Sequence, residues 1–209
     1  MSITSDHLLS EAEQKPLSGG KPMGIRRCVV LHFTSGATAQ SSINFWKEPP
    51  QKKNDIGAHL IIERTGEIYQ CRPFNKTISH AGVSRWVDPK TGKKYKSCNS
   101  FSIGIELANA GDDPKVIKIA SKLPGYDGAM QARHRNGGPL KAWEKYPDAQ
   151  YQACLMAVQQ LVARYNLDDI TSHDAVAPSR KVDVGPAFDM KQFRQACGFG
   201  FTEPVVHQP

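Results

Sequence analysis

The segment Thr171–Asp189, TSHDAVAPSRKVDVGPAFD, places a histidine, a lysine and an aspartate among residues that favour turns. His173 is 8 positions before Lys181 and 10 positions before Asp183. Neither spacing matches the three- or four-residue step that brings side chains together on a helix face. Pro178, Gly185 and Pro186 also argue against regular structure. The sequence therefore predicts a loop that gathers polar groups.

A histidine and a carboxylate are typical zinc ligands, and a catalytic zinc site has three protein ligands and one open position. The loop supplies two such groups, so a third ligand has to come from elsewhere in the chain. The alternative is a polar surface loop in which the aspartate caps a helix. Spacing alone leaves both interpretations open.

Length and composition set the broad class of protein. A chain of 209 residues suits one domain. No apolar run approaches the ~18 residues of a membrane span. The N-terminus has no basic stretch followed by an apolar one, so no secretory signal is expected. The formal charge of +7 predicts an anionic partner, either nucleic acid, a membrane or a cell-wall polymer.

The five cysteines are odd in number and form no CxxC pair. This pattern indicates neither a disulfide framework nor a cysteine zinc cluster. Cys28 lies in an apolar run and Cys154 in a helical pattern, so both are expected to be thiols of the core.

Two apolar runs predict buried strands. The first, Arg26–Thr34 (RRCVVLHFT), has His32 near its end. Functional sites in α/β sheets gather at the carboxyl ends of strands, so His32 is the best candidate for the third ligand, with an ordinary core histidine as the alternative.

The second run, Phe101–Asn109 (FSIGIELAN), carries a carboxylate among apolar neighbours. Alternation places Ser102, Gly104 and Glu106 on one face of this strand. Burying a carboxylate is costly unless it is paired or takes part in chemistry, and exposure at a sheet edge is the alternative.

The remaining segments follow ordinary patterns. Residues 1–22 are polar and are expected to be a tail, as are residues 200–209. Residues 110–146 are rich in glycine and proline, which predicts an irregular functional loop or lid. Further elements are a short helix at Thr38–Trp46, a hairpin made by Ala58–Arg64 and Glu67–Arg72, a helix at Asp148–Asn166 with a core stripe of Tyr151, Leu155, Val158, Val162 and Tyr165, and a short helix at Met190–Cys197.

The segment Ser84–Lys96 (SRWVDPKTGKKYK) is strongly basic. It contains five cations and one anion, and two aromatic residues lie between them. One interpretation is a solvated loop. The other is a lip at the edge of a cleft that meets an anionic polymer.

Five segments occur together in one order: VVLHFT, GAHLIIERTGEIYQ, SHAGVS, NSFSIGIEL and SHDAVAPSRKVDVGPAFD. With them the chain resembles the type 2 N-acetylmuramoyl-L-alanine amidases, which include AmpD-like enzymes, phage amidases and peptidoglycan recognition proteins. The likeness runs from about Cys28 to Phe193. It implies one α/β domain over residues 23–199, with a central mixed β-sheet flanked by helices and a zinc site in a cleft at the strand ends. Ser172 departs from the glycine usual in AmpD-like sequences.

The resemblance also implies roles for particular residues. One zinc ion per chain would be bound by His32, His173 and Asp183. Catalytic roles fall to Glu106 and Lys181. Residues expected to line or support the cleft, or to bind substrate, are His59, His80, Asn99 and, from the basic segment, Arg85.

The function implied is hydrolysis of the amide between N-acetylmuramic acid and L-alanine, by a protein expected to be monomeric. The basic charge favours a bacteriolytic, endolysin-like enzyme that is made in the cytoplasm and released to act on the wall. The alternatives are a cytoplasmic AmpD-like enzyme that recycles anhydro-muropeptides and a peptidoglycan-binding module without activity. A nucleic-acid partner is not expected, because no recognised binding motif occurs.

Overall fold

The computed structural model describes residues 1–200. A six-stranded sheet forms its centre, in the order β1-β4-β3-β7-β2-β10. Only the β3–β4 pair is antiparallel, so the sheet is mixed, as predicted. The strands of this sheet are β1 (Glu13–Gln14), β2 (Cys28–Phe33), β3 (Leu60–Ile62), β4 (Ile68–Gln70), β7 (Ser102–Leu107) and β10 (Asp169–Ser172).

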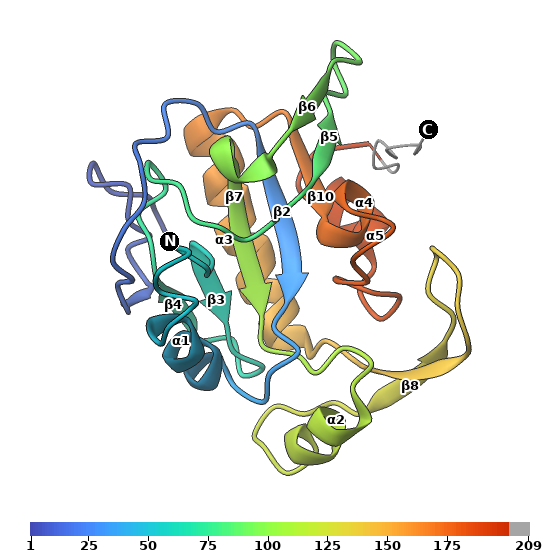
Figure 1. Ribbon diagram of the computed structural model, residues 1–209. Helices are drawn as coiled ribbons and strands as arrows, with labels where there is room; N and C mark the ends of the chain where they lie inside the picture. Colours follow the sequence, from blue (N-terminus) through green and yellow to red (C-terminus); the bar gives the residue numbers. More distant parts are fainter. Residues whose placement is uncertain (201–209) are drawn as a thin grey trace.

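Helices and two small hairpins surround the sheet in a single α/β domain (Figure 1). The helices expected near residues 38–46, 148–166 and 190–197 are all present. The helices are α1 (Ala39–Lys47), α2 (Pro114–Ala120), α3 (Asp148–Tyr165), α4 (His173–Val176) and α5 (Met190–Ala196), with a short 3-10 turn η1 (Cys98–Ser100). The hairpins are β5 (Arg85–Val87) with β6 (Lys94–Lys96), and β8 (Ala129–Ala132) with β9 (Lys141–Glu144).

The central strands β2 and β7 are buried on both faces, which explains their near-continuous apolar runs. On one face Val29, Leu31 and Ile105 pack in a cluster that includes residues of α3. On the other face His32 and Glu106 line a cavity. The predicted alternation of β7 is confirmed.

Helix α3 buries a different set of residues from the stripe that its sequence predicts. Of the five expected stripe residues, only Val158 is fully buried, and the other four are half-buried against the core. The fully buried positions also include the small residues Ala153, Cys154 and Ala157. Small side chains allow the helix axis to approach the sheet, so the contact face is rotated from the row of largest residues.

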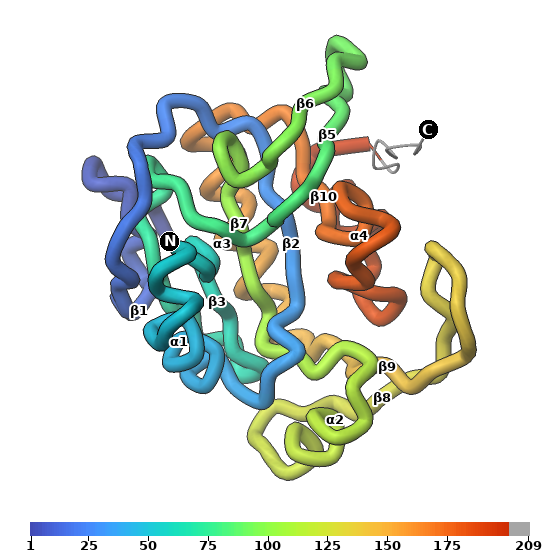
Figure 2. The backbone as a smooth tube through the Cα atoms, in the orientation of Figure 1, coloured from blue at the N-terminus to red at the C-terminus, as the bar shows by residue number. Residues whose placement is uncertain are grey.

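The N-terminal segment is not a tail. Strand β1 pairs with β4 at the edge of the sheet, and Figure 2 shows the segment lying along that side of the domain. Leu9 is buried in the main core, and its backbone N–H donates to Gln70 Oε1 at 2.7 Å. Leu9 and Ala12 are buried, and Met1 and Ile3 pack against the same core, although the average composition of the segment is polar. The other predicted tail lies outside the described residues from position 201 onward.

Two further loop predictions are corrected. Residues 110–146 contain α2 and the β8–β9 hairpin, which extends away from the central sheet (Figure 2). The basic segment Ser84–Lys96 is the β5–β6 hairpin, with Trp86 buried and bonded to Asp169 Oδ2 at the start of β10. The sequence did not predict these two hairpins, because their strands are only three or four residues long and are bounded by turn residues.

Among the described residues, no helix is both long and apolar enough to span a bilayer.

The buried position of Leu9 gives a first prediction. Leu9→Ala should lower the free energy of unfolding by about 2–5 kcal/mol, the usual cost of truncating a buried leucine. Urea denaturation of the purified protein measures this. Leu140→Ala is the matched control, because Leu140 is 57% exposed. Equal effects of the two substitutions would mean that the N-terminal segment does not stabilise the domain.

Candidate active site

Strand register brings two histidines together at the carboxyl ends of β2 and β10. In this parallel pair Ser172 lies opposite Leu31, so the next residues along the strands, His173 and His32, are also neighbours. The sequence predicted that His173 lies in an irregular loop. This is wrong, because His173 begins the short helix α4 directly after β10. The strand end fixes the direction in which its side chain leaves the sheet.

Asp183 returns to the histidines through a tightly bonded turn. The backbone N–H of Asp174 donates to the carbonyl of Asp183 at 2.6 Å. The N–H groups of Arg180 and Lys181 both donate to the carbonyl of Ala177 at 3.0 Å. These bonds hold residues 177–183 so that the Asp183 carboxylate faces His32 and His173.

The three predicted ligands converge as expected. His32 Nδ1, His173 Nδ1 and Asp183 Oδ2 are separated by 2.8, 3.1 and 2.8 Å, and all three side chains are buried. These atoms form a group that could hold a metal ion. Tetrahedral zinc ligands at about 2.0–2.1 Å from the ion stand roughly 3.3 Å apart, close to the observed separations.

Hydrogen bonding at the outer nitrogen of His173 supports this fit. Its Nε2 lies 3.1 Å from the carbonyl oxygen of Ala81, which can only accept, so Nε2 carries the proton. Arg180 Nη2 lies near the same nitrogen, but its two protons go to the carbonyls of Ala81 and Val83. In the neutral His173 ring, Nδ1 then has no proton, and its lone pair lies 2.8 Å from the Asp183 carboxylate oxygen Oδ2, which it repels. A cation between them removes that repulsion, and the donor set suits zinc.

Burial also favours the neutral forms of the His32 and His80 rings. It lowers the pKa of His32 to about 4, with the nearby His173 adding to the effect. It lowers the pKa of His80 well below its usual value, with His32 contributing. Asp183 shifts in the sense that favours its charged form: despite its burial, close contact with His173 and His32 lowers the pKa of its carboxyl. A charged carboxylate and neutral imidazoles are the forms that bind metals.

Glu106 lies opposite His32 in the parallel pairing of β2 with β7. Its Oε2 is buried and has no hydrogen-bond partner among the described residues. Burial raises the pKa of Glu106 to about 8, the charge of Asp183 adds to this, and Lys181 opposes it. β7 lies between β3 and β2 and Glu106 lines a cavity, so the sheet-edge alternative is excluded and the carboxyl can meet a ligand.

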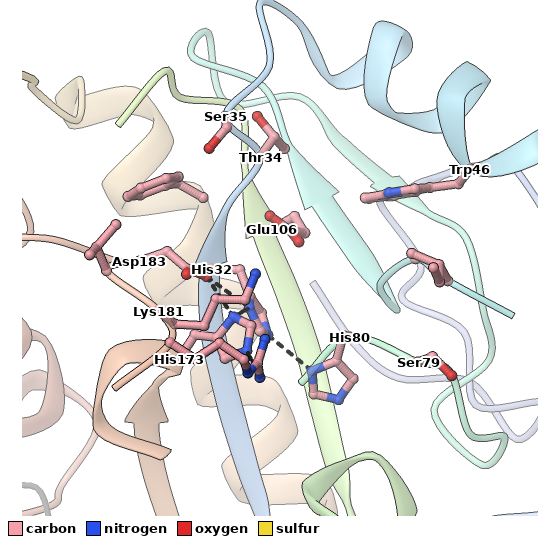
Figure 3. A pocket seen from close by; sticks show the side chains of 15 residues that line it. His32, Thr34, Ser35, Trp46, Ser79, His80, Glu106, His173, Lys181 and Asp183 are labelled. Atoms are coloured by element: carbon pink, nitrogen blue, oxygen red, sulfur yellow. Dashed lines mark hydrogen bonds and ion pairs between the residues drawn. The ribbon is translucent and has the colours of Figure 1, made fainter. Parts of the chain in front are cut away.

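A cavity of about 370 Å³ joins these groups (Figure 3). Lys181 extends into it between the histidines and Glu106. Trp46 and Arg180 also line the cavity, although the sequence did not single them out. Trp46 ends a predicted helix and Arg180 precedes Lys181, so proximity to predicted elements was the only available signal.

Of the other predicted site residues, His80 lines the cavity, and Asn99, His59 and Arg85 do not. The Nδ1 of His80 lies 2.9 Å from His32 Nε2. Asn99 lies behind it and accepts from the backbone N–H groups of His80 and Ala81. His59 is fully buried away from the cavity lining, where its ring bonds the Gly104 N–H and the Lys76 carbonyl. Arg85 is exposed on β5 and is not among the lining residues, so its substrate contact stays a prediction.

With this geometry in place, comparison with known proteins gives the class. A family model described as N-acetylmuramoyl-L-alanine amidase (Amidase_2) matches residues 21–186. The chain belongs to this family. It is similar to the 1,6-anhydro-N-acetylmuramyl-L-alanine amidase AmpD of Salmonella typhimurium (strain SL1344), with 36% identity over 141 residues. The match covers 66% of this chain and 56% of that protein, so the chain spans a little over half the length of this curated relative.

Solved structures show the same fold. The crystal structure of a selenomethionine AmpD derivative superposes with a TM-score of 0.60 at 26% identity, covering 92% of this chain and 97% of that one. The amidase AmiD from E. coli, solved with the substrate anhydro-N-acetylmuramic acid-L-Ala-D-gamma-Glu-L-Lys, superposes with a TM-score of 0.61 at 26% identity. That match covers 84% of this chain and 58% of the AmiD chain.

The converging ligand atoms give a second prediction. The purified protein should bind about one zinc ion per chain, the stoichiometry of a single site of this type. Zinc at 100 times its Kd should stabilise the fold by about 2.7 kcal/mol, seen as a rise in Tm. Asp183→Ala should abolish both effects, and Asp127→Ala, at an exposed aspartate, should keep them. A Tm indifferent to zinc in the parent protein would contradict the site.

Proposed function

We propose that this protein is a zinc-dependent N-acetylmuramoyl-L-alanine amidase, which hydrolyses the amide between N-acetylmuramic acid and L-alanine. The observation that carries the proposal is the cavity in which three buried ligand atoms face an unpaired carboxyl and a lysine. Family membership supports it, because the matching model is described by this activity.

Amide hydrolysis needs an activated water, a polarised carbonyl and a proton for the leaving amine. Zinc held by His32, His173 and Asp183 would supply Lewis-acid polarisation and acidify water. Glu106 is proposed to take the proton of the attacking water and to deliver it to the leaving nitrogen. Its buried position and raised pKa suit this role, since the carboxyl can both hold and release a proton near neutrality.

Lys181 is proposed to stabilise the negative charge that develops on the carbonyl oxygen. Its backbone is fixed by the bond to Ala177, and its side chain enters the cavity beside the ligands. A positioned cation in a partly buried site costs little reorganisation when charge develops, which favours the transition state over bound substrate.

The comparisons favour the recycling alternative over the endolysin-like interpretation. The AmpD relative is named for anhydro-muramyl substrates, and AmiD was solved with one. The basic hairpin also gives limited support for a wall-binding lip, because two of its lysines already have partners within the protein. Lys90 pairs with Asp168 of the main domain at 2.8 Å, and Lys93 lies over the ring of Tyr95 in the hairpin itself. We therefore propose soluble anhydro-muropeptides as the substrate class.

A paired digest tests the function. The purified, zinc-loaded protein should release peptide from soluble anhydro-muropeptides faster than from intact sacculi, as measured by chromatography of the products. Glu106→Gln should retain zinc and fold but lose roughly 10²–10⁴-fold in turnover, the range for general acid–base groups. Faster digestion of sacculi would restore the bacteriolytic interpretation. Binding of both substrates without cleavage would indicate a peptidoglycan-binding module.

The proposed role of Lys181 gives a separate prediction. Lys181→Ala should lower kcat by about 10²–10³-fold and change KM much less, because the lost interaction forms only in the transition state. Lys181→Arg should recover activity in part, since it keeps the charge but alters its reach. Steady-state kinetics on one muropeptide measures both variants. Near-normal turnover of Lys181→Ala would place this lysine outside the chemistry.

A further inference from the structure

The two histidine ligands are held from behind by one short segment, residues 80–81. His32 Nε2 lies 2.9 Å from the ring nitrogen Nδ1 of His80, and His173 Nε2 donates to the carbonyl of Ala81 at 3.1 Å. The supports of both ligands therefore depend on the placement of these two neighbouring residues.

A chain of hydrogen bonds sets the direction of the contact between His80 and His32. Ser102 Oγ lies 2.6 Å from the carbonyl of Cys98, so its hydroxyl proton is donated there. The serine oxygen can then only accept from His80 Nε2, at 3.2 Å. A neutral His80 with its proton on Nε2 has a lone pair on Nδ1, and this lone pair accepts from His32 Nε2. The Nδ1 of His32 is consequently left unprotonated and directed at the other ligands.

The chain also makes room for the His80 ring. On β7, Gly104 lies between Ser102 and Glu106 on the face of the sheet that carries the site. A Cβ on Gly104 would stand 2.4 Å from His80 Cγ, closer than real atoms approach. Any other residue at this position would displace the imidazole from its contact with His32.

The backbone of the segment is anchored in turn by Asn99. Its Oδ1 accepts from the N–H of His80 at 3.1 Å and from the N–H of Ala81 at 2.7 Å. Asn99 lies in the same 3-10 turn as Cys98, whose carbonyl ends the hydrogen-bond chain from Ser102. One turn thus fixes both the backbone and the ring orientation of the supporting residues.

We infer that His80 is a positioning residue of the metal site: it accepts the Nε2 proton of His32 and so directs the Nδ1 lone pair of His32 to the metal, while Asn99 anchors the segment that supports both histidines. The inference rests on the proposed zinc site. Partners of this kind fix the tautomer and orientation of a ligand, and their loss typically costs about 10- to 100-fold in metal affinity.

Zinc affinity of three variants, measured by competition with a chromophoric chelator, tests the role without reference to activity. His80→Phe keeps a ring but has no acceptor, and it should weaken zinc binding by about 10- to 100-fold. His80→Asn should restore most of the affinity, because asparagine Oδ1 is attached to Cγ as histidine Nδ1 is. His59→Phe is the matched control: His59 is a buried histidine whose ring centroid is 6.0 Å from that of His80, but it bonds only backbone groups. It should lower Tm and leave zinc affinity unchanged.

Long-range ¹H–¹⁵N spectra of the histidine rings in the zinc-loaded parent protein provide a measurement that needs no variant. His80 should carry its proton on Nε2 and His32 should also be protonated on Nε2. A proton on Nδ1 of His80, or equal zinc affinity of His80→Phe and the parent, would overturn the positioning role. Absence of zinc binding by the parent protein would overturn the metal site itself, and this inference with it.

Discussion

The parallel pairing of β2 with β7 on one side and β10 on the other is the constraint on which the site depends. Neighbouring strands lie about 4.8 Å apart, so residues in register are held within reach of one another. Register places His32 opposite Glu106 and carries His173 to the side of His32. Two of the proposed ligands and the proposed proton carrier are therefore positioned by backbone hydrogen bonds. The third proposed ligand, Asp183, lies in a turn bonded to the same region.

The short helix α4, which begins at His173, is held in place by a network of buried polar groups around Asp174. The Asp174 carboxylate accepts from Arg135 at 2.6 and 2.9 Å, from the Ser172 hydroxyl at 2.5 Å and from His134 at 2.9 Å. Because His134 and Arg135 lie between β8 and β9, these bonds tie that hairpin to the helix that begins at the proposed metal ligand His173. Ser172, the residue that departs from the AmpD-like pattern, is therefore part of the network that holds the site.

The cavity and the comparisons agree better with the proposed small, soluble substrate than with a wall-binding surface. The cavity volume of about 370 Å³ falls within the range of ordinary ligand pockets. The predicted basic lip is a hairpin near the start of β10, whereas His32 and Glu106 lie toward the carboxyl ends of their strands. The positive charge of the chain remains available for long-range attraction of carboxylate-bearing substrates.

Local patterns in the sequence were enough to predict the buried strands, the main helices and the ligand candidates. Apolar runs and periodicity indicate which residues are buried. A histidine at a strand end, or a histidine and an aspartate in a turn-rich segment, indicates a possible metal or catalytic site. Local patterns could not predict that residues 1–22 are anchored, that β8 and β9 form a hairpin, or that Arg180 lines the cavity. They also could not predict which nitrogen donates and which accepts in the contact between His80 and His32. Each of these depends on contacts between residues far apart in the chain, and such contacts are set by strand register and loop path, which local composition does not encode.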